Sequence, residues 1–174
     1  MTKTKSVISI YLTNLGKYNE GKLIGEWVAL PITEEELAAV KERIGINEHY
    51  EEWFITDYES DLNIQISEYA NITSLNTIAA QLADFDEYDL DRVNFLLSNG
   101  YSLKNALDSY EDVMIFYDCY NDYDFGYAYA EETGLLLGQD EFMQRYFDFE
   151  AFGRDLSFDG MVDCINGNYY VLWY

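Results

Sequence analysis

The first 60 residues alternate short apolar runs with one amphipathic segment. Residues 6–14 (SVISIYLTN) alternate apolar and polar side chains with the period of a half-buried β-strand, and residues 25–31 (GEWVALP) predict a second strand that ends at the only proline. The glycine-rich segment 15–25 between them has the spacing of no phosphate-binding loop, so it predicts turns. Residues 51–59 (EEWFITDYE) predict a third strand.

A helix is predicted over residues 33–45 (TEEELAAVKERIG). Thr33 and Glu36 have the spacing of a capping box, in which each side chain accepts a hydrogen bond from the backbone N–H of the other residue. Gly45 stands where a left-handed residue commonly ends a helix. Together with the strands, this helix predicts a β-rich α+β module over residues 1–60.

The middle of the chain changes to a helical period, with apolar residues three and four positions apart. The predicted helices cover residues 74–85, 90–100 and 102–110. Ser74 and Ser102 are the expected N-caps of the first and the last of these helices, and Gly100 is the expected end of the middle one. These patterns predict a helical module over residues 61–109.

Strand and helix patterns alternate in the last part of the chain. The predicted elements are a strand over 111–119, helices over 121–134 and 139–153, and strands over 161–165 and 168–174. Asn166-Gly167, between the last two strands, is the typical sequence of a tight hairpin turn. Residues 110–174 are therefore expected to form a mixed α+β module with a C-terminal hairpin.

Charge changes the expected arrangement of these modules. The chain has 33 acidic and 10 basic residues, which gives a net charge of -23. Such a charge repels itself and opposes compact packing, whereas a hydrophobic fraction of 49% favours a folded chain over a disordered one. We therefore expect an α+β fold in which the three small modules follow one another as an elongated chain.

The charge and the apolar pattern also exclude partners. Nucleic acid and anionic membranes are bound by basic patches, so neither is expected here. No segment has the roughly 20 apolar residues of a membrane helix, and MTKTKSVISIYL lacks a signal-peptide cleavage site, so a cytoplasmic protein is expected. Cys119 and Cys164 match no metal or redox spacing; we expect reduced, partly buried thiols, with a single disulfide as the alternative.

The sequence contains no clear catalytic or metal motif. His49 has glutamates nearby but no HExxH around it, so a packed or solvated side chain is expected. A calcium loop built around Gly126 would place Tyr123 and Phe125 at ligand positions, where their rings supply no carboxylate. We expect no metal, no cofactor and no enzyme, although the many carboxylate pairs leave a hydrolase with an acid and base pair open.

Residues 117–134 (YDCYNDYDFGYAYAEETG) hold five carboxylates among six aromatic side chains and no basic residue. Duplex DNA presents one negative charge per ~1.7 Å of its axis. Carboxylates on short side chains, with rigid tyrosines between them, imitate such a row of phosphates and suit a DNA-binding groove. The expected partner-binding acids are Asp84, Asp86, Glu87, Asp89, Asp91, Asp108, Glu111, Asp112, Asp118, Asp122, Asp124, Asp148, Glu150 and Asp155.

Four separate segments resemble one protein family, in the same order along the chain. They are YLTNLGKYNEGKLIGEWVALPI (11–32), IGINEHYEEWFITDYE (44–59), AYAEETG (128–134) and FEAFGRDLSFDG (149–160). They resemble the ArdA-type antirestriction proteins. The resemblance implies a DNA mimic, carried by mobile elements such as conjugative transposons, that blocks the DNA-binding groove of the methyltransferase core of type I restriction–modification enzymes.

The resemblance further implies a homodimer of elongated, three-domain chains. The stretch AYAEETGLLLG looks like the family's antirestriction motif near the dimer contact, which here comprises Tyr129, Ala130, Glu131, Glu132, Thr133, Gly134, Leu135, Leu136 and Leu137. Two other classes stay open beside this hypothesis. One is an acidic interaction or chaperone module for a basic protein, and the other is the carboxylate-pair hydrolase.

Overall fold

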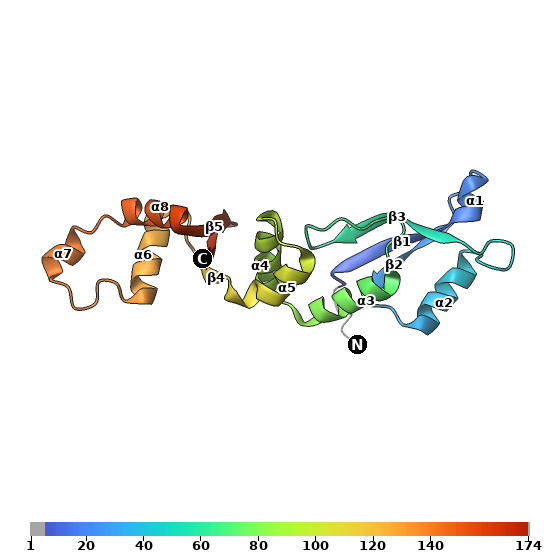
Figure 1. Ribbon diagram of the computed structural model, residues 1–174, viewed down its shortest axis with the longest axis horizontal. Helices are drawn as coiled ribbons and strands as arrows, with labels where there is room; N and C mark the ends of the chain where they lie inside the picture. The colour runs from blue at the N-terminus through green and yellow to red at the C-terminus, as the bar shows by residue number, and fades with distance from the viewer. Residues whose placement is uncertain (1–5, 174) are drawn as a thin grey trace. The chain divides into compact units, whose positions relative to one another are not determined.

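The computed structural model describes residues 6–173 and confirms the α+β fold class, with helices and two antiparallel sheets (Figure 1). The chain divides into two compact units, residues 1–94 and 95–174, which are described in turn. The arrangement as three elongated modules in series stays a prediction. Residues 1–5 and Tyr174, the last residue of the predicted C-terminal strand, lie outside the described residues.

The sheet of the first unit has the strand order β2-β1-β3, with both pairs antiparallel. Its strands are β1 (Ile8–Asn14), β2 (Gly25–Leu30) and β3 (Trp53–Ser60), close to the predicted ranges. Ile8, Ile10 and Leu12 are fully buried, whereas Ser9 and Tyr11 between them are half-buried. The alternating pattern of β1 therefore faces the core on one side, as predicted.

Two helices follow strands of this sheet. The segment predicted as turns contains α1 (Leu15–Asn19), because the side chain of Asn14 caps it by accepting a hydrogen bond from the N–H of Lys17 (3.0 Å). The helix α2 (Glu34–Arg43) begins with the predicted capping box of Thr33 and Glu36. The hydrogen bonds from Thr33 lower the pKa of the Glu36 carboxyl.

The first unit continues with α3 (Ile72–Gln81), the 3-10 helix η1 (Leu82–Asp84) and α4 (Glu87–Ser98). The N-cap of α3 is Asn71, not the predicted Ser74, whose own N–H donates to the Asn71 side chain (3.1 Å). Burial of Ile72, Leu75 and Ala79 sets this earlier start, because it extends the apolar face by one turn. The chain passes into the second unit within α4.

The second unit contains a second sheet of order β4-β6-β5. Its elements are α5 (Leu103–Ser109), η2 (Tyr110–Asp112), β4 (Met114–Phe116), α6 (Asp122–Thr133), α7 (Glu141–Arg145), α8 (Phe149–Asp159), β5 (Gly160–Ile165) and β6 (Asn168–Trp173). Ser102 caps α5 as predicted, and Gly100 has the positive φ (87°) of a helix end. Asn166 (φ 54°) and Gly167 (φ 79°) form the predicted hairpin turn between β5 and β6.

Aromatic side chains dominate the core of the second unit. Phe125 of α6 stacks on Tyr169 of β6 with ring centroids 4.5 Å apart, and Phe116 of β4 meets Phe125 edge-on at 5.3 Å. Leu156 of α8 and Val171 of β6 complete the same cluster. Helices α6 and α8 pack directly against each other over the strands of this core.

Three predictions for the second unit were wrong in detail. The helix expected over 139–153 is two helices, because Asp148 caps a new one by accepting a hydrogen bond from the N–H of Ala151 (2.9 Å). The strand expected over 111–119 is only three residues long, since residues 110–112 form a 3-10 turn. Both cysteines are free, as predicted, but Cys164 is exposed rather than partly buried.

Candidate acidic interaction surface

All of the predicted partner-binding acids are accessible, either fully or in part. Five lie in the first unit and nine in the second. Asp89, Asp91, Asp122 and Asp124 are half-buried; the exposed ones are Asp84, Asp86, Glu87, Asp108, Glu111, Asp112, Asp118, Asp148, Glu150 and Asp155.

Two of these acids begin helices. Asp86 precedes α4, and its Oδ1 accepts a hydrogen bond from the N–H of Asp89 (2.9 Å). Asp148 makes the same kind of contact at the start of α8. A carboxylate at a helix N-terminus accepts from an otherwise unsatisfied N–H and interacts favourably with the helix dipole. Their negative charge is thus partly compensated by the backbone of the chain.

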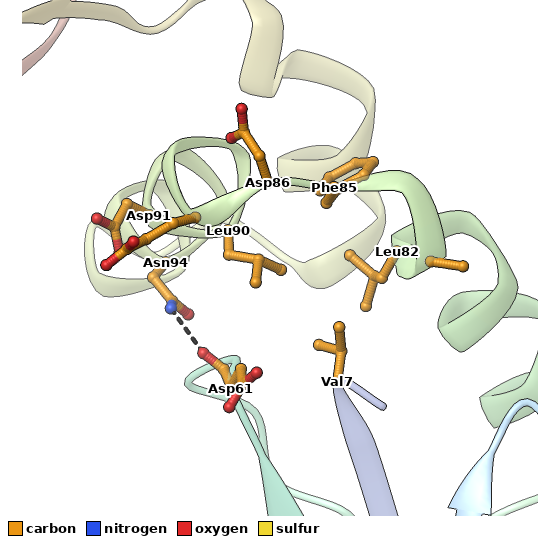
Figure 2. Close-up of a pocket in the computed structure, with 10 residues that line it drawn as sticks. Val7, Asp61, Leu82, Phe85, Asp86, Leu90, Asp91 and Asn94 are labelled. Atoms are coloured by element: carbon orange, nitrogen blue, oxygen red, sulfur yellow. Dashed lines mark hydrogen bonds between the residues drawn. The ribbon is translucent and has the colours of Figure 1, made fainter. Parts of the chain in front are cut away.

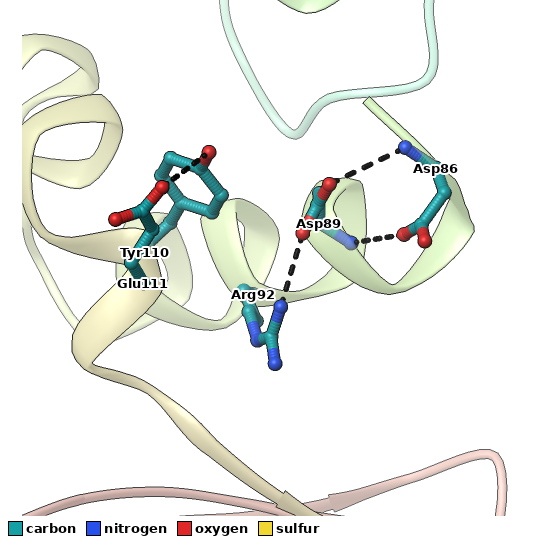
Figure 3. A network of polar contacts seen from close by, with 5 residues as sticks. All are labelled: Asp86, Asp89, Arg92, Tyr110 and Glu111. Carbon is teal, nitrogen blue, oxygen red and sulfur yellow. Dashed lines mark hydrogen bonds and ion pairs between the residues drawn. The ribbon is translucent and has the colours of Figure 1, made fainter. Parts of the chain in front are cut away.

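Asp89 and Asp155 pair with arginines. Figure 3 shows Asp89 between the N–H of Asp86 and the guanidinium of Arg92, whose Nη1 is 3.0 Å from Asp89 Oδ1. Asp155 Oδ1 lies 3.2 Å from Arg154 Nη2 on the exposed face of α8. These two acids therefore present less net charge than their exposure suggests.

Tyrosine hydroxyl groups contact two further acids. The hydroxyl of Tyr110 donates to Glu111 Oε1 (3.3 Å), as Figure 3 also shows. The hydroxyl of Tyr169 donates to Asp122 Oδ1 (3.2 Å). Burial, followed by the charge of Asp122, raises the pKa of Tyr169 to about 12, so the phenol stays protonated and keeps donating.

Asp118, which lies between β4 and α6, and Asp124, in the first turn of α6, make hydrogen bonds that involve the local backbone. Asp124 Oδ2 accepts from the N–H of Tyr120 (3.0 Å), and the N–H of Asp124 donates to the cap residue Asn121 (3.0 Å). Asp118 has a positive φ of 55°, and its N–H donates to the side chain of Asn168 (3.1 Å). This segment is therefore held in place at both ends.

The remaining group of acids carries charge that no group within residues 6–173 balances. Within residues 6–173, the carboxylates of this group form neither a hydrogen bond nor an ion pair, and all are exposed. They are Asp84, Glu87, Asp108, Asp112, Asp118 and Glu150. Sequence reasoning could not separate this group from the capping acids, because the two groups differ in contacts and not in composition.

The predicted motif 129–137 is divided between core and surface. The ring of Tyr129 lies among Phe116, Phe152 and Trp173, with centroids 5.5–5.8 Å away, and Ala130 is buried. The last turn of α6, formed by Glu131, Glu132 and Thr133, is exposed, and Gly134 ends the helix in the left-handed conformation. Leu136 is half-buried, whereas Leu135 and Leu137 are exposed to 44% and 88%.

Further apolar side chains follow these leucines and were not predicted as site residues. Phe142, Met143 and Tyr146, in and after α7, are all at least 60% exposed, and Phe158 of α8 is 80% exposed. The side chain of Gln144 donates to the carbonyl oxygens of Leu136 (3.3 Å) and Gln139 (3.1 Å), which ties α7 to the preceding loop. We call residues 135–146 the apolar segment.

The described residues form no candidate metal site. No group of three or more His, Cys, Asp or Glu side chains within residues 6–173 is placed to hold a metal ion. His49 is exposed and meets the ring of Tyr50 edge-on at 4.7 Å. Burial, followed by the charges of Asp124 and Asp118, raises the pKa of the Cys119 thiol, which makes it a poor nucleophile.

None of the helices in residues 6–173 has both the length and the apolar character needed to cross a bilayer.

A family model described as antirestriction protein (ArdA) matches residues 10–171, and none of the curated proteins matches the chain at a significant level. Because the match spans both units from β1 to β6, the chain belongs to the ArdA family of antirestriction proteins, a family directed against type I restriction enzymes.

Proposed function

We propose that this protein inhibits type I restriction–modification enzymes by occupying the DNA-binding groove of their methyltransferase core, with its carboxylates in the place of DNA phosphates. The observation that carries the proposal is the group of exposed acids without a protein partner, in a chain of net charge -23. Within residues 6–173 the carboxylates of this group form neither a hydrogen bond nor an ion pair. Their charge opposes folding, and a basic groove would neutralise it.

The chemistry of the surface supports this role. A basic groove that neutralises DNA phosphates gains free energy by releasing the counterions around them, and carboxylates of similar density release counterions in the same way. Tyr123 and Tyr127 are half exposed and lie parallel, 6.5 Å apart, against Phe149. Such fixed rings keep neighbouring carboxylates apart without adding positive charge.

The acids that form no hydrogen bond or ion pair within residues 6–173 are the best substitutes for DNA phosphates. Asp84, Asp108, Asp112 and Glu150 keep their full charge for a partner. Asp86 and Asp148 add weaker charge from helix starts. We expect the summed field of many such groups, and not any one contact, to supply the affinity.

The protein acts as a homodimer in this proposal, with the contact in the second unit. The apolar segment supports it: Leu137, Phe142 and Tyr146 are exposed to 88%, 65% and 69%. Large apolar side chains that follow one another along an exposed segment mark interaction surfaces, and a second copy would remove them from water.

Displacement of DNA from a purified type I methyltransferase core tests the proposal. A fluorescent duplex that carries the enzyme's recognition sequence is bound to the core, and the protein is added at two salt concentrations. We expect complete release of the duplex, with a potency that falls steeply as salt rises, because the attraction is screened beyond about 8 to 10 Å near physiological ionic strength. Polyglutamate of matched charge controls for non-specific competition.

Two other results would assign a different function. Binding to the core without release of DNA would make the protein an acidic interaction module. Loss of inhibition through one Asp→Asn or Glu→Gln change, with binding intact, would indicate a carboxylate-pair hydrolase.

A further inference from the structure

A pocket of about 500 Å³ lies in the first unit. Figure 2 shows the apolar side chains of Val7, Leu82 and Leu90 directed toward one space, with the ring of Phe85 beside it. Acidic and small residues complete the lining: Asp61, Ala83, Asp86, Glu87, Asp91 and Asn94. The pocket therefore has an apolar floor with four carboxylates around it, and none of its lining residues within residues 6–173 is cationic.

Hydrogen bonds fix the wall of this pocket. The Asn94 side chain of α4 donates to the carbonyl oxygen of Asp61 (2.9 Å) and accepts from the N–H of Asn63 (2.7 Å). The N–H of Asp61 in turn donates to the carbonyl oxygen of Val7 (3.0 Å). Because one amide joins α4 to this loop through both its donor and its acceptor, the pocket is preorganised and binding need not order its wall.

The lining selects the chemistry of an occupant. Phosphate or carboxylate groups would be repelled by Asp86 and Glu87, and a wholly apolar group would take these carboxylates out of water without a cation to balance their charge. An arginine side chain meets both conditions, because its methylene stem packs on apolar side chains while its guanidinium pairs with carboxylates. The planar guanidinium also stacks on aromatic rings, and Phe85 offers one.

We propose that this pocket takes an arginine side chain that projects from the DNA-binding groove of the restriction enzyme. The inference rests on the proposed function, which supplies a partner rich in basic residues. It adds a shaped anchor to a surface that otherwise acts through summed charge. Such an anchor gives register, because a row of charges alone allows the inhibitor to slide along the groove.

Filling the pocket without changing its charge is the first test. Ala83 is exposed and lines the pocket, so Ala83→Trp places an indole there without entering the core. We expect the concentration needed to displace DNA from the methyltransferase core to rise about tenfold or more, as for loss of an interface anchor. The unfolding midpoint of the variant shows whether the fold is kept.

Removing the charge of the pocket is the second test, and the chain offers a matched control. Asp86→Asn with Glu87→Gln removes two charges at the start of α4, and asparagine caps a helix as well as aspartate does. Glu34→Gln with Glu35→Gln removes two charges from the first turn of α2 in the same unit. We expect about a tenfold loss of potency from the pocket pair and less than about fivefold from the control pair.

A probe of the free protein separates this inference from the proposed function. N-acetyl-argininamide at millimolar concentration should shift the backbone amide NMR signals of Ala83 and Leu90, and Ala83→Trp should abolish the shifts. N-acetyl-lysinamide should act more weakly, since it cannot stack on Phe85. Equal shifts from both compounds would show that the pocket accepts any cation, which would overturn the assignment of arginine.

The remaining outcomes decide between the two proposals. Release of DNA by the native chain and by Ala83→Trp at equal concentrations overturns the pocket assignment and leaves the proposed function standing. Failure of the native chain to release DNA overturns the proposed function, and the partner assigned to the pocket with it. Binding of the arginine probe only after Lys3→Gln and Lys5→Gln would make the chain's own N-terminal segment the occupant, which also overturns the assignment.

Discussion

Gly126 of α6 and Gly153 of α8 meet at the crossing of the two helices, and a Cβ atom on either one would lie 2.8 Å from the backbone nitrogen of the other. The same added carbon would also overlap a backbone carbonyl oxygen, that of Phe149 for Gly126 and that of Asp122 for Gly153. Backbone atoms cannot turn aside as side chains do. The two helices can therefore pack this closely only because both positions lack a side chain.

Gly126→Ala and Gly153→Ala should each destabilise the second unit. Alanine favours a helix by up to about 1 kcal/mol over glycine, but forced separation of packed helices typically costs about 1–3 kcal/mol, so we expect a net loss. Urea unfolding measures it, and faster hydrogen exchange in α6 locates it. Glu131→Ala, at an exposed position on α6, is the control and should leave the stability almost unchanged. Glycine variants as stable as the native chain would contradict the close crossing of the two helices.

The buried phenol of Tyr169 should make stability depend on alkaline pH. Its pKa rises from 10.0 to about 12 in the folded chain, so folding favours the protonated form. The stability that folding gains from the protonated phenol is fully present below pH 10 and is lost as the pH rises toward 12. The free energy of unfolding, measured between these two pH values, should fall less steeply in Tyr169→Phe than in the native chain. A spectrophotometric titration of this variant should show one fewer late-ionising tyrosine.

Neutralising the acids without a protein partner should weaken inhibition gradually. Asp84→Asn, Asp108→Asn, Asp112→Asn and Glu150→Gln should each lower the potency of DNA displacement by less than about fivefold. The four together should lower it much more and should flatten its dependence on salt, because fewer counterions are exchanged. One substitution that removes all inhibition would contradict a surface acting through summed charge.

Leu137→Glu should give a folded monomer. Leu137 is 88% exposed, so the change costs little stability within one chain, whereas it would bury a charge at a dimer contact. Sedimentation velocity measures the mass, and circular dichroism shows whether the fold is retained. Leu23→Glu, at a leucine of the first unit that is 62% exposed, is the matched control and should stay dimeric. A dimer that survives Leu137→Glu would place the contact elsewhere.

Elements with strong local signals could be predicted from the sequence. The capping box of Thr33 and Glu36 and the hairpin at Asn166-Gly167 depend on contacts within a few residues, and the structure shows both. The short helix α1 could not be predicted in this way. Its cap residue Asn14 is buried and donates to the carbonyl oxygens of Ile44 (3.2 Å) and Gly45 (3.1 Å), which are distant in sequence.

The candidate site shows the same limit. That its acids are accessible could be predicted from their number, because a core cannot accommodate so many carboxylates. Which of them cap helices, as Asp86 does, depends on where each helix begins, and the break before α8 was missed. The pocket was not predicted at all, because Val7, Asp61 and Leu90 come from separate parts of the chain.

The acids at helix starts limit how this surface can adapt to another groove. At Asp148 the residues that keep the start of α8 are Asp, Asn, Ser and Thr, so a charge there can be removed but cannot be moved along the helix. Glu150, two positions later, does not cap the helix, so its charge can be moved to a neighbouring exposed position at little cost to the stability of the helix. Variants directed at a groove whose basic residues are spaced differently should therefore relocate acids such as Glu150. The acids at helix starts should keep their positions.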